Sequence, residues 1–261
     1  MANKLDLTIT RPNVARAYDA AMGGRYNSAE DRKIEEMGRK LFPHLSLFAR
    51  FQRQFLFYIA GQIGHAGLNH VIDLGSGLPT QGALHEHLPQ HTKVLYNDHD
   101  PETIALARYI IRDHPDIRYV QCKIEDTATV LAAAEELFED IRRVCITLIG
   151  VAYFINDADL ARVCQELYRW SAPGSMLAIS FFNTDEHDPS WADIVKKYQG
   201  MGVQLYPRSA AHMLSLLGPW QADVTGIRPI EEFVEMGQIG TLAAPPEMRG
   251  TIGFAGVFTH P

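Results

Sequence analysis

The sequence predicts an α/β protein with a doubly wound, mostly parallel seven-stranded sheet that follows an N-terminal helical segment. Three observations predict this class. Five short, almost wholly apolar runs lie between residues 71 and 182, helical segments separate them, and two further β-like runs end the chain. Apolar strands that alternate with helices are typical of a parallel sheet covered on both faces. With 261 residues, of which 46% are hydrophobic, the chain can fill the core of such a domain.

Helical periodicity marks residues 12–64, ahead of the first predicted strand. The pair Gly23 and Gly24 interrupts this periodicity, and Pro43 stops it before a long amphipathic run begins. We therefore expect residues 1–64 to form a helical extension and residues 65–261 to form the α/β domain.

The alternation of apolar runs and helical segments gives the order of elements in the α/β domain. The predicted strands are 71–75, 93–98, 117–122, 142–150 and 175–182, and the predicted helices are 82–89, 101–113, 128–138, 157–169 and 189–199. A last helix at 209–218 precedes the β-like runs 222–230 and 251–259. We expect these two runs to pair antiparallel at the edge of the sheet.

Composition makes several classes of partner poor expectations. A formal net charge of −7 gives no overall basic field for a phosphate backbone, so nucleic acid is not an expected partner. The N-terminus lacks the apolar stretch of a secretory signal, and no window approaches the roughly 18 apolar residues of a membrane span. We expect a soluble, cytoplasmic protein without a membrane partner.

Neither the cysteines nor the histidines suggest a metal site. Cys122, Cys145 and Cys164 are too widely spaced for a C-x-x-C pair and fit reduced thiols in a core. His85 and His87 flank Glu86, but positions i and i+2 point to different sides of a helix, whereas helical zinc motifs use i and i+4. No metal is expected, and His85 and Glu86 are better candidates for supporting the turn that precedes them.

A glycine turn after the first predicted strand is the strongest functional signal. Ligands of doubly wound sheets bind beyond the C-terminal ends of the strands. Gly75 and Gly77 let a ligand approach the backbone there, and Asp73 offers a carboxylate. The dinucleotide fingerprint G-x-G-x-x-G would need glycine at position 80, where Thr80 stands. The turn therefore favours a ligand without a pyrophosphate.

The second predicted strand ends in an acid suited to a ribose. Asp98 is placed to accept hydrogen bonds from two ribose hydroxyls, while Asp100, followed by Pro101, fits a helix N-cap. A bare glycine turn and a ribose-binding acid describe a nucleoside site without phosphates, and S-adenosylmethionine meets that description.

At these residues the chain resembles the Rossmann-like S-adenosylmethionine-dependent methyltransferases, and more narrowly a bacterial, largely actinobacterial family of them. The resemblance covers most of residues 11–183. It rests on RPNVARAYDAAMGGRYN (11–27), ARFQRQFL (49–56), IDLGSGLPTQGALHE (72–86), YNDHDP (96–101) and LIGVAYFIND (148–157).

The resemblance implies S-adenosylmethionine as cofactor and a set of residues that bind it. Asp73, Gly75, Ser76 and Gly77 would line the methionine portion and the ribose, and Asp98 would hold the ribose diol. Around the adenine it implies His99 and Ile124, with Glu125 or Asp126 as a polar contact. Gly150, at the end of the fourth predicted strand, is a further candidate cofactor contact. Lys123 stands where superfamily members commonly carry an acid.

The family-like N-terminal segment is expected to close the site as a helical lid. Within it, Arg25 or Arg16 would receive the methionine carboxylate in a bidentate contact. We favour Arg25, beside Tyr26, because glycines let the chain fold closely there. The alternative is that each arginine pairs at the surface with Asp19 or Glu30.

The cofactor's sulfonium is already activated, so the protein must mainly align and desolvate the reactants. Aromatic faces near the sulfonium stabilise its charge. Tyr153, Asn156 and Tyr18 are the candidates for this role and for positioning, and the candidate substrate contacts are Phe154, Phe182, Asn183 and Tyr206. The alternative is that the aromatic residues pack in the core and the asparagines cap turns.

Three functions are compatible with this site. The leading hypothesis is an enzyme that transfers a methyl group from S-adenosylmethionine to a small-molecule nucleophile. A second is cyclisation of S-adenosylmethionine to azetidine-2-carboxylate and methylthioadenosine, and a third is a regulatory protein that binds the cofactor without turnover. The sequence favours no particular acceptor or oligomeric state.

Overall fold

A single seven-stranded sheet organises the computed structural model, which describes residues 11–184, 189–200, 202–239, 242–246, 249–251 and 253–261. The strand order is β3-β2-β1-β4-β5-β7-β6. The strands are β1 (His70–Leu74), β2 (Lys93–Asp98), β3 (Ile117–Gln121), β4 (Cys145–Leu148), β5 (Met176–Phe181), β6 (Gln221–Pro229) and β7 (Phe254–Thr259). Strands β1 to β5 pair parallel, whereas β7 is antiparallel to both β5 and β6. The predicted α/β class and the antiparallel terminal pair are confirmed.

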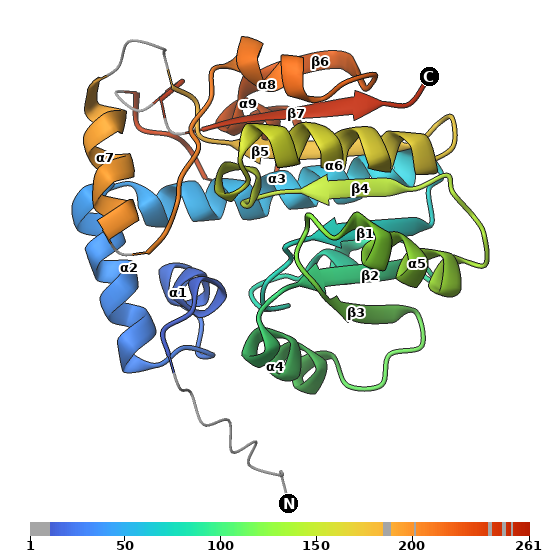
Figure 1. Cartoon of the computed structure of the whole chain (residues 1–261), viewed down its shortest axis with the longest axis horizontal. Helices are drawn as coiled ribbons and strands as arrows, with labels where there is room; N and C mark the ends of the chain where they lie inside the picture. Colours follow the sequence, from blue (N-terminus) through green and yellow to red (C-terminus); the bar gives the residue numbers. More distant parts are fainter. Residues whose placement is uncertain (1–10, 185–188, 201, 240–241, 247–248, 252) are drawn as a thin grey trace, which may run out of the picture.

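Helices cover both faces of the sheet, which explains the apolar strand sequences. Every residue of β1, β4 and β5 is buried. Successive residues enter different cores: Val71 packs with α3 (Leu45–His65), and Ile72 packs with α5 (Thr127–Phe138) and α6 (Asp157–Trp170). Figure 1 shows α5 and α6 in front of the sheet and α3 behind it. The remaining helices are α1 (Val14–Ala21), α2 (Ala29–Leu41), α4 (Pro101–Ile111), α7 (Pro189–Gly200), α8 (Ala210–Leu216) and α9 (Ile230–Met236).

The structure differs from the sequence prediction at two elements. The predicted helix at 82–89 is only a short 3₁₀ turn, η1 (Leu84–His87), because Gly82 has a positive φ of +83° and Pro89 disfavours helical geometry at the preceding residue. The helix α9 was not predicted, since β6 runs directly into it at Pro229. Within η1, the backbone N–H and ring Nδ1 of His85 both contact the Tyr96 hydroxyl, at 3.0 and 2.9 Å, so His85 fastens η1 to β2.

The N-terminal helices lie where the parallel strands end. In Figure 1 the parallel strands point toward the side on which α1, α2 and α7 lie. The long helix α3 buries apolar residues in the same core as β1, β2 and β5, so the hydrophobic core continues across residue 64. The division into residues 1–64 and 65–261 stays a prediction about function.

No helix in the part of the chain that the structure describes has the length and apolar character that crossing a membrane requires.

Candidate cofactor site

The glycine turn is fastened to the end of β2 by backbone hydrogen bonds. The N–H of Gly75 donates to Asn97 Oδ1 at 3.3 Å, and the N–H of Ser76 donates to the Asn97 carbonyl at 2.9 Å. Gly75 and Gly77 have φ of +65° and +62°, a backbone conformation that residues with a Cβ rarely adopt. These bonds hold the bare backbone of the turn directly beside Asp98.

Space as well as conformation requires the two glycines. A Cβ on Gly75 would lie 2.5 Å from Val151 Cγ1 and 3.1 Å from Ile124 Cδ1, and a Cβ on Gly77 would lie 3.3 Å from Ala15 Cβ. The turn is therefore approached from three sides: by the segments after β3 and β4, and by α1. The structure thus brings Ile124 to the turn, as the sequence predicts for a residue that packs near the cofactor.

Asp98 presents a buried carboxylate at the edge of the turn. Its Oδ2 accepts the N–H of Gly77 at 3.2 Å, and its Oδ1 accepts the N–H of Asp100 at 2.9 Å. The residue is 8% exposed, and burial raises the pKa of its carboxyl group. A carboxylate has about four lone-pair positions, so each oxygen can accept a further hydrogen bond. His99 lies beside it, with Nδ1 3.5 Å from Oδ1 and a largely exposed ring.

Asp73 is a second buried acid, at the end of β1. Its Oδ1 accepts the hydroxyl of Thr147, its register partner on β4, at 2.5 Å. Burial raises the pKa of Asp73 to about 6, against the hydrogen bond from Thr147 and the charge of Arg53, which both lower it. Two acids thus stand at the carboxyl ends of neighbouring strands, at the edge where doubly wound sheets bind ligands.

The polar residues expected after β3 have other contacts. Asp126 caps α5: its carboxylate accepts the N–H of Thr129 at 3.3 Å and the hydroxyl of the same residue at 2.8 Å. The carbonyl of Glu125 accepts a hydrogen bond from Arg162 at 2.9 Å. These contacts give Asp126 a structural role, and a polar contact from either acid to the adenine stays a prediction.

The end of β4 carries an aromatic cluster with a buried polar group beside it. The rings of Tyr153 and Phe182 are 4.2 Å apart, and Phe48 from α3 lies 4.7 Å from Phe182. The amide Nε2 of Gln52 is 3.5 Å from both the Tyr153 hydroxyl and Ser180 Oγ, and Ser180 Oγ accepts the N–H of Gly150 at 2.9 Å. Burial raises the pKa of Tyr153, so this phenol stays protonated.

Four of the predicted substrate and catalytic residues therefore lie together after β4 and β5. Phe154 packs at 4.6 Å from Tyr153, and the N–H of Tyr206 donates to the Tyr153 carbonyl at 2.8 Å. Phe182 completes this group. Asn183 forms an isolated bridge with Arg208 next to it.

Asn156 and Tyr18 take structural positions. Both ends of the Asn156 side chain engage Asp159, with Oδ1 accepting its N–H at 2.9 Å and Nδ2 donating to its carboxylate at 2.7 Å, so Asn156 caps α6. The Tyr18 hydroxyl donates to the Ala49 carbonyl at 2.8 Å and ties α1 to α3. The capping alternative holds for Asn156, while the ring of Tyr18 still faces the guanidinium of Arg53 at 5.8 Å.

Arg208 is a site-forming residue that the sequence reading missed. It is 2% exposed and binds the segment after β4, donating to the carbonyls of Ala152 at 2.9 Å and Ile155, and from Nε to Asp157 at 2.8 Å. The guanidinium thus fixes the backbone on either side of Tyr153. No motif surrounds Arg208, and these three partners lie more than 50 residues away along the chain.

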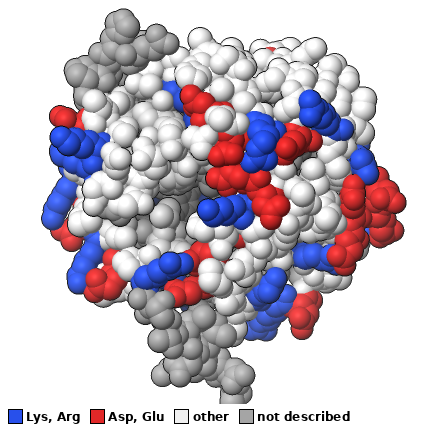
Figure 2. All heavy atoms as spheres, viewed as in Figure 1, with Lys and Arg blue, Asp and Glu red and all other residues white. Residues whose placement is uncertain are grey.

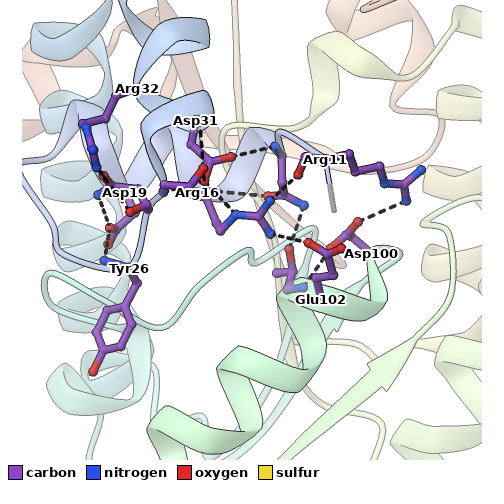
Figure 3. Close-up of polar contacts among 12 residues, drawn as sticks. Arg11, Arg16, Asp19, Tyr26, Asp31, Arg32, Asp100 and Glu102 are labelled. Carbon is purple, nitrogen blue, oxygen red and sulfur yellow. Dashed lines mark hydrogen bonds and ion pairs between the residues drawn. The ribbon is translucent and has the colours of Figure 1, made fainter. Parts of the chain in front are cut away.

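Arg16 fastens the N-terminal helices to the rest of the molecule. Figure 3 shows its guanidinium between Asp31 on α2 and Glu102 on α4. Nε is 2.8 Å from Asp31 and Nη1 is 2.8 Å from Glu102, and the Arg16 side chain is 2% exposed. The N-cap residue Asn13 adds a bond from Nδ2 to Thr103 at 3.0 Å. These acids engage the donors of Arg16, and a contact of Arg16 with a cofactor carboxylate stays a prediction.

Asp19 joins the following turn to the segment after the glycine turn. Its carboxylate accepts the N–H of Tyr26 at 2.8 Å, Nδ2 of Asn27 at 2.9 Å and the hydroxyl of Thr80 at 2.7 Å. A Cβ on Gly24 would lie 2.1 Å from Asp19 Oδ1, so the glycine permits this close approach. Thr80, which replaces the third fingerprint glycine, is thereby a structural anchor.

Arg25 is not one of the buried residues around the glycine turn. Its side chain is exposed and lies over the Tyr26 ring, 5.4 Å from the centroid. The two residues line a cavity of about 450 Å³ together with Gly23, Pro79, Thr80, Gln81 and Ile110. Asp73, Gly75, Gly77 and Asp98 do not line that cavity. A contact of Arg25 with the cofactor stays a prediction.

Comparison with known proteins identifies the family. A family model described as S-adenosyl methyltransferase matches residues 1–244. The chain belongs to the S-adenosyl methyltransferase family. A methyltransferase candidate from Thermobifida fusca superposes with a TM-score of 0.84 at 22% identity, covering 97% of this chain and 96% of that one.

A second solved structure has the same fold. A DUF574 family protein from Streptomyces avermitilis gives a TM-score of 0.81 at 22% identity, over 96% of this chain and 98% of that chain. A search of curated proteins found no significant match. The family match and these structures confirm the Rossmann-like methyltransferase fold and the predicted resemblance.

The residues of this S-adenosyl methyltransferase family member fit S-adenosylmethionine, the cofactor of the family. Gly75 and Gly77 leave backbone bare beside a buried carboxylate with spare acceptor positions, which suits a ribose diol. Thr80 stands where a pyrophosphate site would have its third glycine, and its hydroxyl donates to Asp19. When bound, the cofactor supplies an electrophilic methyl carbon on a sulfonium, and the chain has to position it.

We predict that Arg16→Ala destabilises the protein strongly. The substitution leaves Asp31, which is 0% exposed, buried without its cation. Removing one partner of a buried ion pair costs about 3–5 kcal/mol, and we expect about 3, since the Glu102 side chain is 20% exposed and stays partly solvated. Urea unfolding measures the change. Lys33→Ala, at an exposed pair with Glu30, is the control and should leave the midpoint unchanged; equal midpoints for both variants would contradict the role of Arg16.

We predict that Asp73→Asn stabilises the protein at neutral pH. Because the folded pKa of about 6 exceeds the ordinary value of 3.8, the folded state binds more protons between these values, and wild-type stability falls as the pH rises through them. Asparagine keeps an acceptor for Thr147 and has no ionisation to oppose. At about 1.4 kcal/mol per pKa unit, the variant should gain up to about 3 kcal/mol at pH 7.

Urea midpoints of wild type and Asp73→Asn across this pH range test that prediction. The difference between the two proteins should be small near pH 4 and should grow until about pH 7. A difference that stays constant with pH would show that Asp73 does not ionise at a cost in the folded protein.

Proposed function

We propose that this protein transfers a methyl group from the sulfonium of S-adenosylmethionine to a nucleophilic atom of a small molecule. The observation that carries the proposal is the buried Asp98 carboxylate, which accepts a hydrogen bond from the Gly77 N–H. The glycine turn beside it lacks a third glycine. This arrangement suits a ribose without a pyrophosphate.

The residues after β4 and β5 support a small acceptor. Tyr153, Phe154 and Phe182 form an apolar, aromatic wall, and Gln52 is the buried polar group beside it. In this proposal the wall excludes water and holds the acceptor in line with the carbon and the sulfur. Alignment and desolvation of this kind can supply much of the rate, because the leaving group is neutral.

The surface charge gives no support to a nucleic-acid acceptor. Figure 2 shows Lys and Arg side chains interspersed with Asp and Glu on the face that it presents. The sequence as a whole carries a net charge of −7. Binding a phosphate backbone draws on a continuous basic surface. A small molecule is therefore the acceptor that we propose.

We also propose that α1 and α2 act as a lid over the cofactor. Ala15 of α1 lies close to the position of a Cβ on Gly77, and Arg16 joins both helices to α4. The helices thus lie against the turn, and their ion pairs with α4 hold them there. Opening of these contacts would admit the cofactor.

Cyclisation of the cofactor has no specific observation in its favour among the described residues. The buried carboxylates and the aromatic wall suit either reaction. The products separate the two functions: methyl transfer yields S-adenosylhomocysteine, and cyclisation yields methylthioadenosine.

A label-transfer assay tests the proposal. Purified protein is incubated with methyl-tritiated S-adenosylmethionine and separate low-molecular-mass, protein and nucleic-acid fractions of a bacterial lysate. We expect acceptor-dependent S-adenosylhomocysteine and label in the low-molecular-mass fraction. Label in the protein or nucleic-acid fraction would contradict the small-molecule acceptor, and methylthioadenosine formed without any fraction would indicate cyclisation.

A further inference from the structure

Arg53, on α3, carries a buried donor that nothing in the described part of the chain uses. Its Nη1 donates to the Gly82 carbonyl at 3.0 Å and its guanidinium lies over the Tyr18 ring, whereas its Nε is buried and has no hydrogen-bond partner there. A buried cationic donor without a partner is costly and rare in folded proteins. The side chain therefore indicates an acceptor that binds from outside the chain.

Other arginines near the predicted site differ from Arg53 in this respect. Arg16 is paired with two acids, and Arg208 is engaged by one acid and three backbone carbonyls. Arg25, the sequence-based choice for the cofactor carboxylate, is exposed and lies over a neighbouring ring. Arg53 is the one of these four with a buried donor left over.

Arg53 binds the segment on one side of the glycine turn, and Asp73 lies on the other side. Nη1 of Arg53 is bound to the carbonyl of Gly82, in the segment that follows the turn, and Asp73 lies near the end of β1, directly before it. Oδ1 of Asp73 is engaged by Thr147. The charge of Arg53 also lowers the pKa of the Asp73 carboxyl group.

Arg53 and Asp73 together have the charge pattern of an α-amino acid in reverse. An α-amino acid carries a carboxylate and an ammonium group on one carbon, and a guanidinium and a carboxylate separated by a short distance complement both charges. The Nε and Nη2 groups form one edge of the guanidinium fork, which binds a carboxylate bidentately. Nη1, on the other edge, is anchored by Gly82 and holds the fork in place.

We propose that Arg53 receives the α-carboxylate of the cofactor's amino-acid end while Asp73 faces its α-ammonium group. This inference rests on the proposed function, since it takes S-adenosylmethionine as the ligand of the site. It assigns to Arg53 on α3 the carboxylate contact for which the sequence favoured Arg25. Arg53 and Asp73 would then make the site selective for adenosyl compounds that retain the amino-acid tail.

The rigidity of α3 suits this role. The preceding residue, Gln52, is 2% exposed and contacts Tyr153, and Phe51 and Phe55 on either side are fully buried. The helix is therefore fixed against the sheet on its apolar face, and Arg53 reaches from it to the Gly82 carbonyl. A binding group on a rigid helix holds its ligand at a defined position relative to the acceptor wall.

Two ligands that differ only in the tail test the assignment. S-adenosylhomocysteine carries the amino-acid end, and 5′-methylthioadenosine lacks it. Calorimetry measures both dissociation constants for wild type, Arg53→Gln and Arg53→Lys. Arg50→Gln, at an exposed arginine on the same helix, is the matched control, and Arg25→Gln tests the sequence-based alternative.

We expect Arg53→Gln to weaken the binding of S-adenosylhomocysteine by about 10- to 100-fold, which is the range for losing a hydrogen bond to a charged group. Its affinity for 5′-methylthioadenosine should stay within about twofold of wild type, which also shows that the variant is folded. Arg53→Lys should fall between wild type and Arg53→Gln, because it keeps the charge and loses the fork. The Arg50→Gln control should keep the wild-type ratio of the two affinities, and so should Arg25→Gln if Arg53 is the carboxylate-binding residue.

Three results would overturn the assignment. Equal weakening of both ligands in Arg53→Gln would indicate a structural role, unchanged affinity for S-adenosylhomocysteine would exclude the contact, and a changed ratio in Arg25→Gln would move it to the N-terminal segment. The proposed function fails separately, through the label-transfer assay: a wild-type protein that binds S-adenosylhomocysteine and passes no label to small molecules refutes the function and leaves the Arg53 assignment intact.

Discussion

The site depends on the attachment of the glycine turn to the end of β2. The backbone N–H groups of Ser76 and Gly77 donate to the Asn97 carbonyl and to Asp98, so two neighbouring parallel strands end in one hydrogen-bonded unit. This unit fixes the position of bare backbone relative to a carboxylate. The segments after β3 and β4 and the helix α1 then pack against the turn, and a side chain on Gly75 or Gly77 would meet them.

Contacts between distant segments complete the site, and arginine side chains make several of them. Arg16 binds α2 and α4, and Arg208 binds the backbone around Tyr153, each from a position far along the chain from its partners. Both guanidinium groups are fully engaged in structural contacts. The two acids and Arg53 near the turn have spare hydrogen-bonding capacity, which is the pattern expected where a charged ligand completes the polar contacts.

Local patterns in the sequence predicted local structure well. Apolar runs predicted β1 to β5: every residue of β1, β4 and β5 is buried, whereas the edge strand β3 is buried only in part. Asp100 before Pro101 predicted the cap of α4, where its carboxylate accepts the Thr103 N–H at 2.8 Å. The roles of Arg16, Arg53 and Arg208 could not be read in the same way, since an arginine at the surface and one that bridges distant segments have similar local sequence. Asn156 is a second example. A polar side chain at a loop end can either cap a helix or position a substrate, and the sequence could not distinguish the cap of α6 from the predicted positioning role.

Binding of S-adenosylhomocysteine and NADH measured by calorimetry tests the central claim most directly, namely that the turn after β1 accepts an adenosyl compound and not a phosphorylated dinucleotide. The account predicts that the wild-type protein binds S-adenosylhomocysteine, that Asp98→Asn weakens this binding, and that NADH gives no heat. Binding of NADH by a protein that gives no heat with S-adenosylhomocysteine would contradict it.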